Sequence, residues 1–296
     1  MTTLERRWVT GIDLRPHSHG AINFSRWLHA HDEDSQLSFD ALHVVDTRAL
    51  ELPEAPSRTE LVGRARSATQ TALKVRSALE LFDSVSIVDS DSVVETLDSA
   101  GVLRITAGLI LGRRAAGEDQ AFIRLGRVAR RMLRRLPCPV FVVPSDLELH
   151  HVGMGPIVCA VELDDQGLSL VRHARALGVL VGRPVHVVHV VGDNTPVGFA
   201  YVPETAWDQA HEHIHARGKS ELEAWLDAAG HELESSCPRG RVVPTLIAKA
   251  RELDACMILS SSRRLSATER LFISSVGSTL AAAAHVPVGI IPPKRD

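Results

Sequence analysis

Two stretches of 36 residues decide the fold: LILGRRAAGEDQAFIRLGRVARRMLRRLPCPVFVVP (Leu109–Pro144) and MILSSSRRLSATERLFISSVGSTLAAAAHVPVGIIP (Met257–Pro292). They align without a gap at an offset of 148 residues and share six identities, including Pro139/Pro287. Each contains a short apolar run, a turn, a helical pattern and a second apolar run. This alternation is typical of βαβ units in a parallel sheet.

Three earlier blocks repeat in the same order and at nearly the same offset. Because fixed-period self-similarity indicates repeated units, the chain is expected to contain two copies of one domain. We predict domains at residues 1–148 and 149–296, with the boundary near His150 to Pro156. The paired blocks are Val9–Leu14 with Val158–Leu163, Leu42–Val45 with Val188–Val191, and Val93–Leu97 with Val242–Leu246.

Each half is expected to fold as an α/β domain with a doubly wound parallel sheet. Helices are predicted at Gly20–Ala30, Ser57–Leu81, Ser92–Leu103 and Gly126–Leu136, with a capping-box spacing at Ser92 and Glu95. Strands are predicted near Trp8–Asp13, Ala41–Val45, Val85–Val88, Leu109–Leu111 and Val140–Val143, then Ile157–Val161, Val185–Val191, His231–Ser235, Cys256–Leu259 and Val288–Ile291.

The composition excludes several classes of protein. With 45% hydrophobic and 23% charged residues, the chain is neither disordered nor collagen-like. A formal net charge of -3 gives no overall field to hold nucleic acid or an anionic membrane. Seven Phe, four Trp and one Tyr provide few stacking platforms for single-stranded nucleic acid. Any anion site is therefore expected to be local.

The cysteines and the apolar segments indicate a cytoplasmic protein. The four cysteines show neither CxxC spacing nor disulfide-scaffold density, so we expect reduced, buried thiols. Met1 to Arg7 lacks the apolar stretch of a signal peptide. The longest apolar run, Leu280 to Ile291, is interrupted by His285 and Pro287 and is too short to cross a membrane.

Candidate binding residues follow the predicted strands. Asp13 and Glu162 each end the first strand of a half, where ligands bind in open parallel sheets. Each carboxylate either binds a ligand, by accepting hydrogen bonds from ribose hydroxyls or holding a metal-phosphate, or is an exposed acid that caps the next helix. Gly112, in the turn after the fourth strand, and Gly126, at the start of the last helix, would let backbone amides approach a phosphate closely.

These elements resemble the universal stress proteins, specifically their two-domain members. The resemblance covers nearly the whole chain and implies Rossmann-like domains related by a pseudo-two-fold axis. It also implies a phosphate motif, Gly-x2-Gly-x9-Gly-Ser/Thr, an aspartate on the first strand and an adenine contact after the second-strand histidine. Carried over, the positions are Asp13, Val44, Gly112, Ala115, Gly126 and Arg127, with Val128 beside them, and then Glu162, Val190, Ser260, Arg263, Ser274 and Ser275.

Both halves depart from that motif. In the first half Ala115 replaces a glycine and Arg127 replaces the hydroxyl, and ten residues rather than nine precede Gly126. In the second half all three glycines are replaced, although Ser275 keeps the hydroxyl. Each replacement adds a Cβ where a phosphate would press on the backbone. Arg127 either grips a phosphate with its guanidinium or is simply solvated.

Two further patterns carry a structural and a functional interpretation. Arg127, Arg130, Arg131, Arg134 and Arg135 share one helical face, which is either solvated or docks an acidic partner or a nucleic-acid backbone. His211, His213 and His215 have the spacing of a zinc pair but lack a fixed third ligand, so an exposed histidine-rich helix is favoured. His43 and His189 are expected to be bonded in the core. No nucleophile is paired with a base, so no enzyme is predicted.

The sequence therefore predicts a cytoplasmic stress-response protein that binds and regulates. ATP or another adenine nucleotide is expected in the first domain, with a degenerate second site and no metal. The alternative is a scaffold or interaction protein in which both sites are degenerate. Partners are an unidentified protein and no membrane, and nucleic acid is not expected. The halves should pair through Val140–Val143 and Val288–Ile291 as a pseudo-dimer, with a homodimer left open, and the uncharged helix Ser275–Ala284 should be covered.

Overall fold

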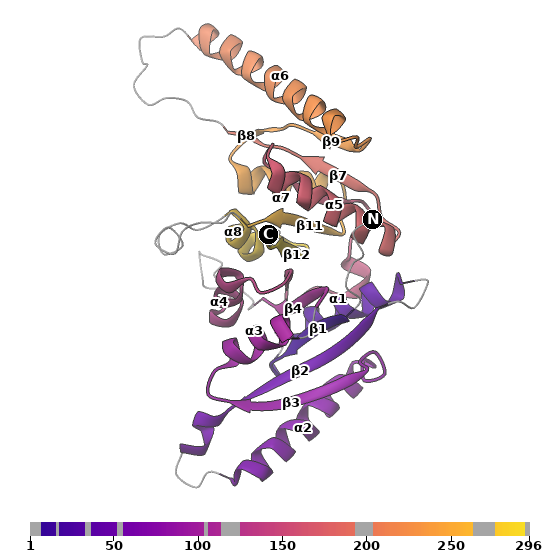
Figure 1. Cartoon of the computed structure of the whole chain (residues 1–296), viewed down its shortest axis with the longest axis vertical. Coiled ribbons are helices and arrows are strands. Elements are labelled where there is room, and N and C mark those ends of the chain that lie inside the picture. The colour runs from indigo at the N-terminus through magenta and orange to yellow at the C-terminus, as the bar shows by residue number, and fades with distance from the viewer. Residues whose placement is uncertain are drawn as a thin grey trace.

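In the computed structural model the two halves share one continuous sheet of ten strands (Figure 1). The structure describes residues 7–15, 18–32, 37–51, 56–103, 106–113, 125–192, 204–262 and 276–293. The strand order is β3-β2-β1-β4-β5-β12-β11-β6-β7-β9. In each half the chain's first strand lies third from the outer edge, with the fourth and fifth strands continuing inward. Both halves are therefore doubly wound α/β units with the same topology.

The strands agree with the predicted positions to within a few residues. Those of the first half are β1 (Arg7–Ile12), β2 (Ser38–Asp46), β3 (Ser84–Ser90), β4 (Gly108–Gly112) and β5 (Val140–Val143). Those of the second half are β6 (Ile157–Ala160), β7 (Val185–Val188), β9 (Glu234–Ser236), β11 (Met257–Ser261) and β12 (Val288–Ile291). A separate two-stranded sheet pairs β8 (Val191–Gly192) with β10 (Arg239–Gly240).

Helices cover both faces of the sheet, and each face buries its own apolar cluster. One face carries α1 (His19–Ala30), α2 (Arg58–Val75), α5 (Asp165–Leu180) and α6 (Glu204–Ala228). The other carries α3 (Val93–Leu103), α4 (Arg127–Arg135), α7 (Val242–Glu252) and α8 (Val276–Ala283). Figure 1 places α2 and α6 at opposite ends of the elongated molecule.

Local sequence explains where several helices begin. Ser57 and Glu60 form a complete capping box at the start of α2. Asp164 caps α5 by accepting a hydrogen bond from the Gly167 amide at 2.7 Å. Of the capping box predicted at Ser92 and Glu95, one hydrogen bond is present, in which the Glu95 amide donates to Ser92 Oγ at 3.3 Å.

The halves join through their final strands, as predicted. β5 and β12 pair antiparallel, with Phe141 opposite Gly289. These two residues occupy equivalent positions in the repeat, so a pseudo-two-fold axis passes between them. The expectation that α8 is covered was only partly correct, because Ala282 is buried but Thr279 is exposed.

The connection between the halves is packed against both of them. Asn23 on α1 donates from Nδ2 to the Leu147 carbonyl at 2.9 Å. On the other side, the Gly155 amide donates to the Asp254 carbonyl at 2.8 Å. A Cβ added at Gly155 would lie 1.9 Å from the Leu253 carbonyl oxygen, so only glycine fits there. The segment that connects the halves is therefore held in place by both.

Candidate functional site

The predicted site lies where the strand order reverses. β1 pairs with β2 on one side and β4 on the other, and the chain leaves β1 and β4 on opposite faces of the sheet. In open parallel sheets, ligands bind at this switch point beyond the carboxyl ends of the strands. Pairing of β1 with β2 ends at Ile12 opposite His43, so Asp13 and Val44 come next on neighbouring strands. Gly112 ends β4 on the other side.

Asp13 is exposed and is the first residue of a tight turn. Its Oδ1 accepts a hydrogen bond from the Arg15 amide at 2.9 Å. Leu14 between them has φ 59°, a left-handed conformation that is unfavourable for a side chain with a Cβ. No bond to Oδ2 is present in the described part of the chain. The turn thus leaves one carboxylate oxygen available to a ligand.

A histidine ties the second strand to the first in both halves. His43 Nδ1 lies 2.7 Å from the Ile12 carbonyl, and His189 Nδ1 lies 3.1 Å from the Val161 carbonyl. A carbonyl only accepts, so Nδ1 must carry the proton in each ring. Both histidines are half-buried, which agrees with their predicted structural role. In each half, this hydrogen bond fixes the position of the second strand immediately before Val44 or Val190.

A charged pair that sequence reasoning missed borders the first crevice. Asp46, the last residue of β2, accepts hydrogen bonds from the Arg48 amide at 3.1 Å and from Arg48 Nε at 2.8 Å. The Arg48 side-chain bond is the main cause that lowers the pKa of Asp46 to about 2, and Arg127 contributes to the same shift. The sequence feature that could have predicted this pair is the Asp-x-Arg spacing at the end of a predicted strand. Asp46 therefore stays ionised beside Arg48.

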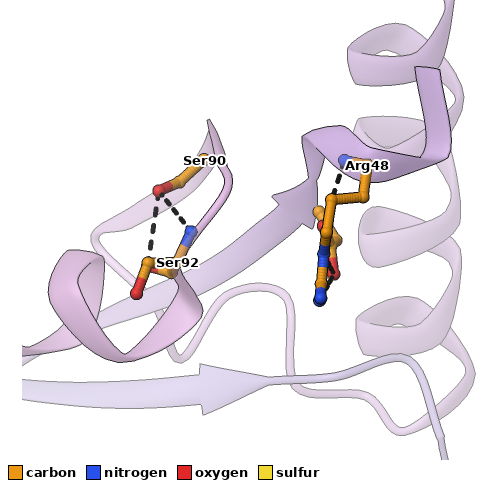
Figure 2. A network of polar contacts seen from close by, with 4 residues as sticks. Arg48, Ser90 and Ser92 are labelled. Carbon is orange, nitrogen blue, oxygen red and sulfur yellow. Dashed lines mark hydrogen bonds and ion pairs between the residues drawn. The ribbon is translucent and has the colours of Figure 1, made fainter. Parts of the chain in front are cut away.

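Serines continue the polar border at the next strand. Ser90 ends β3, and its Oγ receives a hydrogen bond from the Ser92 amide at 3.1 Å, as Figure 2 shows. Ser92 in turn begins α3 through its bond with the Glu95 amide. The hydroxyls of Ser90 and Ser92 accept hydrogen bonds within local turns, and these turns shape the rim of the crevice.

The phosphate end of the predicted site is described only in part. Gly126 precedes α4 and is half-buried, Arg127 is the exposed first residue of α4, and Val128 is half-buried. Ala115 and Ser275 lie outside the described residues, as do Arg263 and Ser274. The structure therefore brings together Asp13, Val44 and Gly112 from the strands. No hydrogen bond or ion pair between Arg127 and these three residues is present in the described part of the chain.

The second crevice has the same topology but different surroundings. Glu162 is exposed and Val190 is half-buried, and each lies two residues beyond the end of its strand. Ser260, at the Gly112 position, is 6% exposed and bonds weakly to the Ser261 carbonyl at 3.4 Å. β7 stops at Val188, and the chain then pairs with β10. This half therefore places a buried side chain where the first half has only backbone.

The arginine stripe on α4 is exposed, as its spacing predicted. Arg135 pairs with Asp98 of α3 at 2.9 Å. Ala129 and Met132, on the other side of the helix, are buried.

The histidine-rich segment of α6 shows no metal site in the part that is described. His213 and His215 are exposed, and His215 Nε2 lies 2.7 Å from the Cys237 carbonyl. The side chain of His211 is outside the described set. Across the described ranges, no group of three or more His, Cys, Asp or Glu residues is placed to hold a metal ion.

A hollow of about 240 Å³ opens between α3 and the outer strands of the first half. Asp40, Ser86, Thr96 and Ser99 contribute its polar lining, and no predicted site residue is among those that border it. Ligand pockets for small molecules usually exceed about 300 Å³. We assign no ligand to this hollow.

Comparisons with known proteins agree with this architecture. A model of the universal stress protein family matches residues 6–144 and 154–292. A universal stress protein from Archaeoglobus fulgidus DSM 4304 is similar over 97% of this chain and 98% of its own, with 16% identity and a TM-score of 0.66. A functionally unknown protein from Pseudomonas aeruginosa PAO1 is similar over 97% of this chain and 92% of its own, with 15% identity and a TM-score of 0.63.

Shorter matches cover about one half of the chain. The universal stress protein from Archaeoglobus fulgidus in complex with dAMP matches 47% of this chain and 98% of its own, with 26% identity and a TM-score of 0.29. No curated protein sequence gave a significant match. Among the described residues, no helix is both long and apolar enough to cross a membrane.

Proposed function

Because the chain belongs to the universal stress protein family, with the family domain repeated twice, we propose that it is a stress-response protein that regulates by binding an adenine nucleotide. The site is the first-half crevice. The observation that carries the proposal is the arrangement of Asp13, Val44 and Gly112 on three adjacent strands at the switch point. The protein works by binding rather than by turnover, and it acts in the cytoplasm.

Each residue has a role that suits its position. Asp13 accepts hydrogen bonds from ribose hydroxyls through the oxygen that the turn leaves available. The backbone at Val44 contacts adenine. Amides near Gly112 and Gly126 approach the phosphate, because neither residue places a Cβ in the way. Arg127 adds a guanidinium at the start of α4, where its fork suits a phosphate.

The electrostatics favour weak binding. Asp46 is ionised at the edge of the crevice, so its negative charge opposes an incoming phosphate. Interactions between exposed charges amount to only about 0 to 1 kcal/mol, so this repulsion reduces affinity without abolishing it. In the second half Ser260 buries a side chain at the position of Gly112, which supports a degenerate site there.

The second candidate is an interaction protein that binds no nucleotide. It is favoured by Ala115 and Arg127, which replace the glycine and the hydroxyl of the family motif. In this case the exposed face of α4 would carry the function through an unidentified protein partner. The two candidates differ in a direct binding measurement.

The test is calorimetry of the full chain with AMP, ADP and ATP. We expect binding that Asp13→Ala weakens at least tenfold and that Glu162→Ala leaves unchanged. Arg127→Ala should weaken binding several-fold, whereas Arg130→Ala is the matched control one helical turn further along the same exposed face. A guanidinium bond to phosphate is stronger than a neutral one, which sets this expectation.

Two results would contradict the proposal. Loss of binding in Glu162→Ala with Asp13→Ala unaffected would move the site to the second half. No heat with any of the three nucleotides, and no small molecule released from the purified protein in mass spectrometry, would favour the interaction protein.

A further inference from the structure

Three polar side chains meet at the outer edge of the second half. In the described part of the chain β9 is the last strand of the sheet, and it pairs parallel with β7 at the end nearest α6 (Figure 1). His186 of β7 lies opposite Glu234 of β9, which is two residues before Ser236. Side chains two positions apart share one face of a strand, so all three point to the same side of the sheet. The His186 ring, which is 9% exposed, contacts both of the others.

The contacts of His186 assign its two ring nitrogens. Nδ1 lies 3.5 Å from Glu234 Oε2, and Nε2 lies 3.0 Å from Ser236 Oγ. An ionised carboxylate can only accept a hydrogen bond, so the proton of the neutral ring is on Nδ1. The lone pair of Nε2 then faces the Ser236 hydroxyl. This is the tautomer in which a histidine removes a proton from a serine. The Glu234 contact is long, as catalytic hydrogen bonds often are before a substrate binds.

The backbone places a free amide next to Ser236. The Ser236 carbonyl points to the β7 side, because it accepts a hydrogen bond from the His189 amide at 3.1 Å. In a trans peptide the carbonyl and the next N–H point in opposite directions, and no cis peptide bond occurs among the described residues. The Cys237 amide therefore points away from β7, and it has no acceptor within the described ranges. In α/β-hydrolases the amide after the nucleophile stabilises the oxyanion.

Neighbouring contacts hold this serine in place and leave it as the reactive group. The Cys237 carbonyl accepts a hydrogen bond from His215 Nε2 of α6 at 2.7 Å. The Cys237 thiol is buried, and burial raises its pKa, so it stays protonated and does not compete as a nucleophile. Ser236 itself is half-buried rather than enclosed. It is therefore the nucleophile that a small reagent can reach.

The repeat supplies a natural comparison. In the first half Asp40 takes the place of His186, since both lie three residues before the histidine that binds the first strand. Asp40 pairs with Arg7 at 3.1 Å and accepts a hydrogen bond from the Ser84 hydroxyl. Ser86 takes the place of the second-half serine, but this occupied carboxylate lies beside it instead of an imidazole. The first half therefore has the serine without the base.

From this arrangement we propose that Ser236 is a nucleophile that takes an acyl group from activated carboxylic esters and thioesters. Ser236 Oγ attacks the carbonyl carbon while His186 Nε2 accepts the hydroxyl proton, and the Cys237 amide donates to the oxyanion of the tetrahedral intermediate. The intermediate expels the alcohol or thiol, which takes the proton from His186, and the acyl group stays on Ser236. Glu234 is a positioning residue that keeps the proton on Nδ1. This reaction is independent of the nucleotide site proposed in the first half.

The test is the reaction of the full chain with p-nitrophenyl acetate, followed by release of p-nitrophenolate and by mass spectrometry of peptides. We expect a burst of one p-nitrophenolate per chain, with the acetyl group on Ser236. Ser236→Ala should abolish the burst, and His186→Gln should slow it about a hundredfold or more. Two matched controls should react like the unaltered protein. They are Ser235→Ala, on the other face of the same strand, and Ser86→Ala, at the equivalent position of the first half.

The positioning role of Glu234 has its own readout. Glu234→Gln keeps the size of the side chain, but its amide can donate as well as accept, so Nδ1 no longer has to carry the proton. Acylation should slow about tenfold, because the wrong tautomer cannot take the serine proton. Nitrogen-15 NMR of His186 should show the proton on Nδ1 in the unaltered protein and a larger share on Nε2 in the variant. Glu232→Gln, at a neighbouring exposed carboxylate, is the control.

Two results would overturn the proposal. One is acetylation confined to lysines or the N-terminus, at a rate that Ser236→Ala does not change. The other is an equal burst rate in His186→Gln and the unaltered protein. If a variant does not fold, the site of acetylation in the unaltered protein still decides, because Ser236 should be labelled and Ser86 should not.

Discussion

Replacing Gly20 with alanine should destabilise the whole molecule. Gly20 is in the first turn of α1, and a Cβ there would lie 1.8 Å from the Pro144 carbonyl oxygen and 2.9 Å from its carbon. Those backbone atoms cannot shift freely, because Asn23 bonds to the Leu147 carbonyl close by. The helix would have to move away from the connection between the halves. Overpacking of this kind costs about 1 to 3 kcal/mol, and the backbone contact places Gly20→Ala at the upper end.

The measurement is thermal unfolding followed by circular dichroism. A loss of about 3 kcal/mol corresponds to a midpoint lower by about 6 to 10 °C in a protein of this size. Gly63→Ala on the exposed face of α2 should be neutral or slightly stabilising, because alanine favours a helix and nothing is nearby. A midpoint for Gly20→Ala within a degree of the unaltered protein would refute the close packing of α1 on the connection.

Three further predictions follow from charges and burial. Asp46→Asn should strengthen nucleotide binding two- to fivefold in calorimetry, since it removes a negative charge from the edge of the crevice; weaker binding would contradict this. The four cysteines should resist a thiol reagent at pH 8 until denaturant is added, because burial raises the pKa of Cys138 and of Cys256 to about 12; rapid native labelling of either would be the contrary result. Burial lowers the pKa of His173 from 6.5 to about 4, so the folded state favours the neutral ring. Stability should be full above pH 6.5 and fall as the pH drops toward 4, and urea midpoints that do not change across this range would argue against it.

Much of the fold could be predicted from the sequence because its signals are local or repeated. Val140–Val143 is a continuous apolar run, as expected for a strand buried on both faces, and it pairs with its repeat equivalent. Ser57, Ser92 and Asp164 cap the starts of α2, α3 and α5. The third strand of the second half was predicted at His231–Ser235 and is instead a short strand at Glu234–Ser236, because little apolar pattern marks it.

The remaining features depend on contacts between distant residues. Arg113 directly follows Gly112 in the predicted phosphate turn, yet its guanidinium binds the carbonyls that end a helix in the other half. Gly289 gave no signal in the sequence, since its importance depends on the Phe141 ring beside it. The candidate site was predicted from a resemblance to the family motif, and the charged pair of Asp46 and Arg48 was missed although its Asp-x-Arg spacing is visible in the sequence. Spacing predicts which residues share a strand or a helix face, but not which distant groups meet.

The central claim is that one half of this repeated chain binds an adenine nucleotide and the other does not. The stoichiometry of AMP binding to the full chain, measured by calorimetry at protein concentrations well above the dissociation constant, tests this most directly. We expect one AMP molecule bound per chain in the unaltered protein, and also one per chain in the Glu162→Ala variant. Two nucleotides per chain, or none, would contradict it.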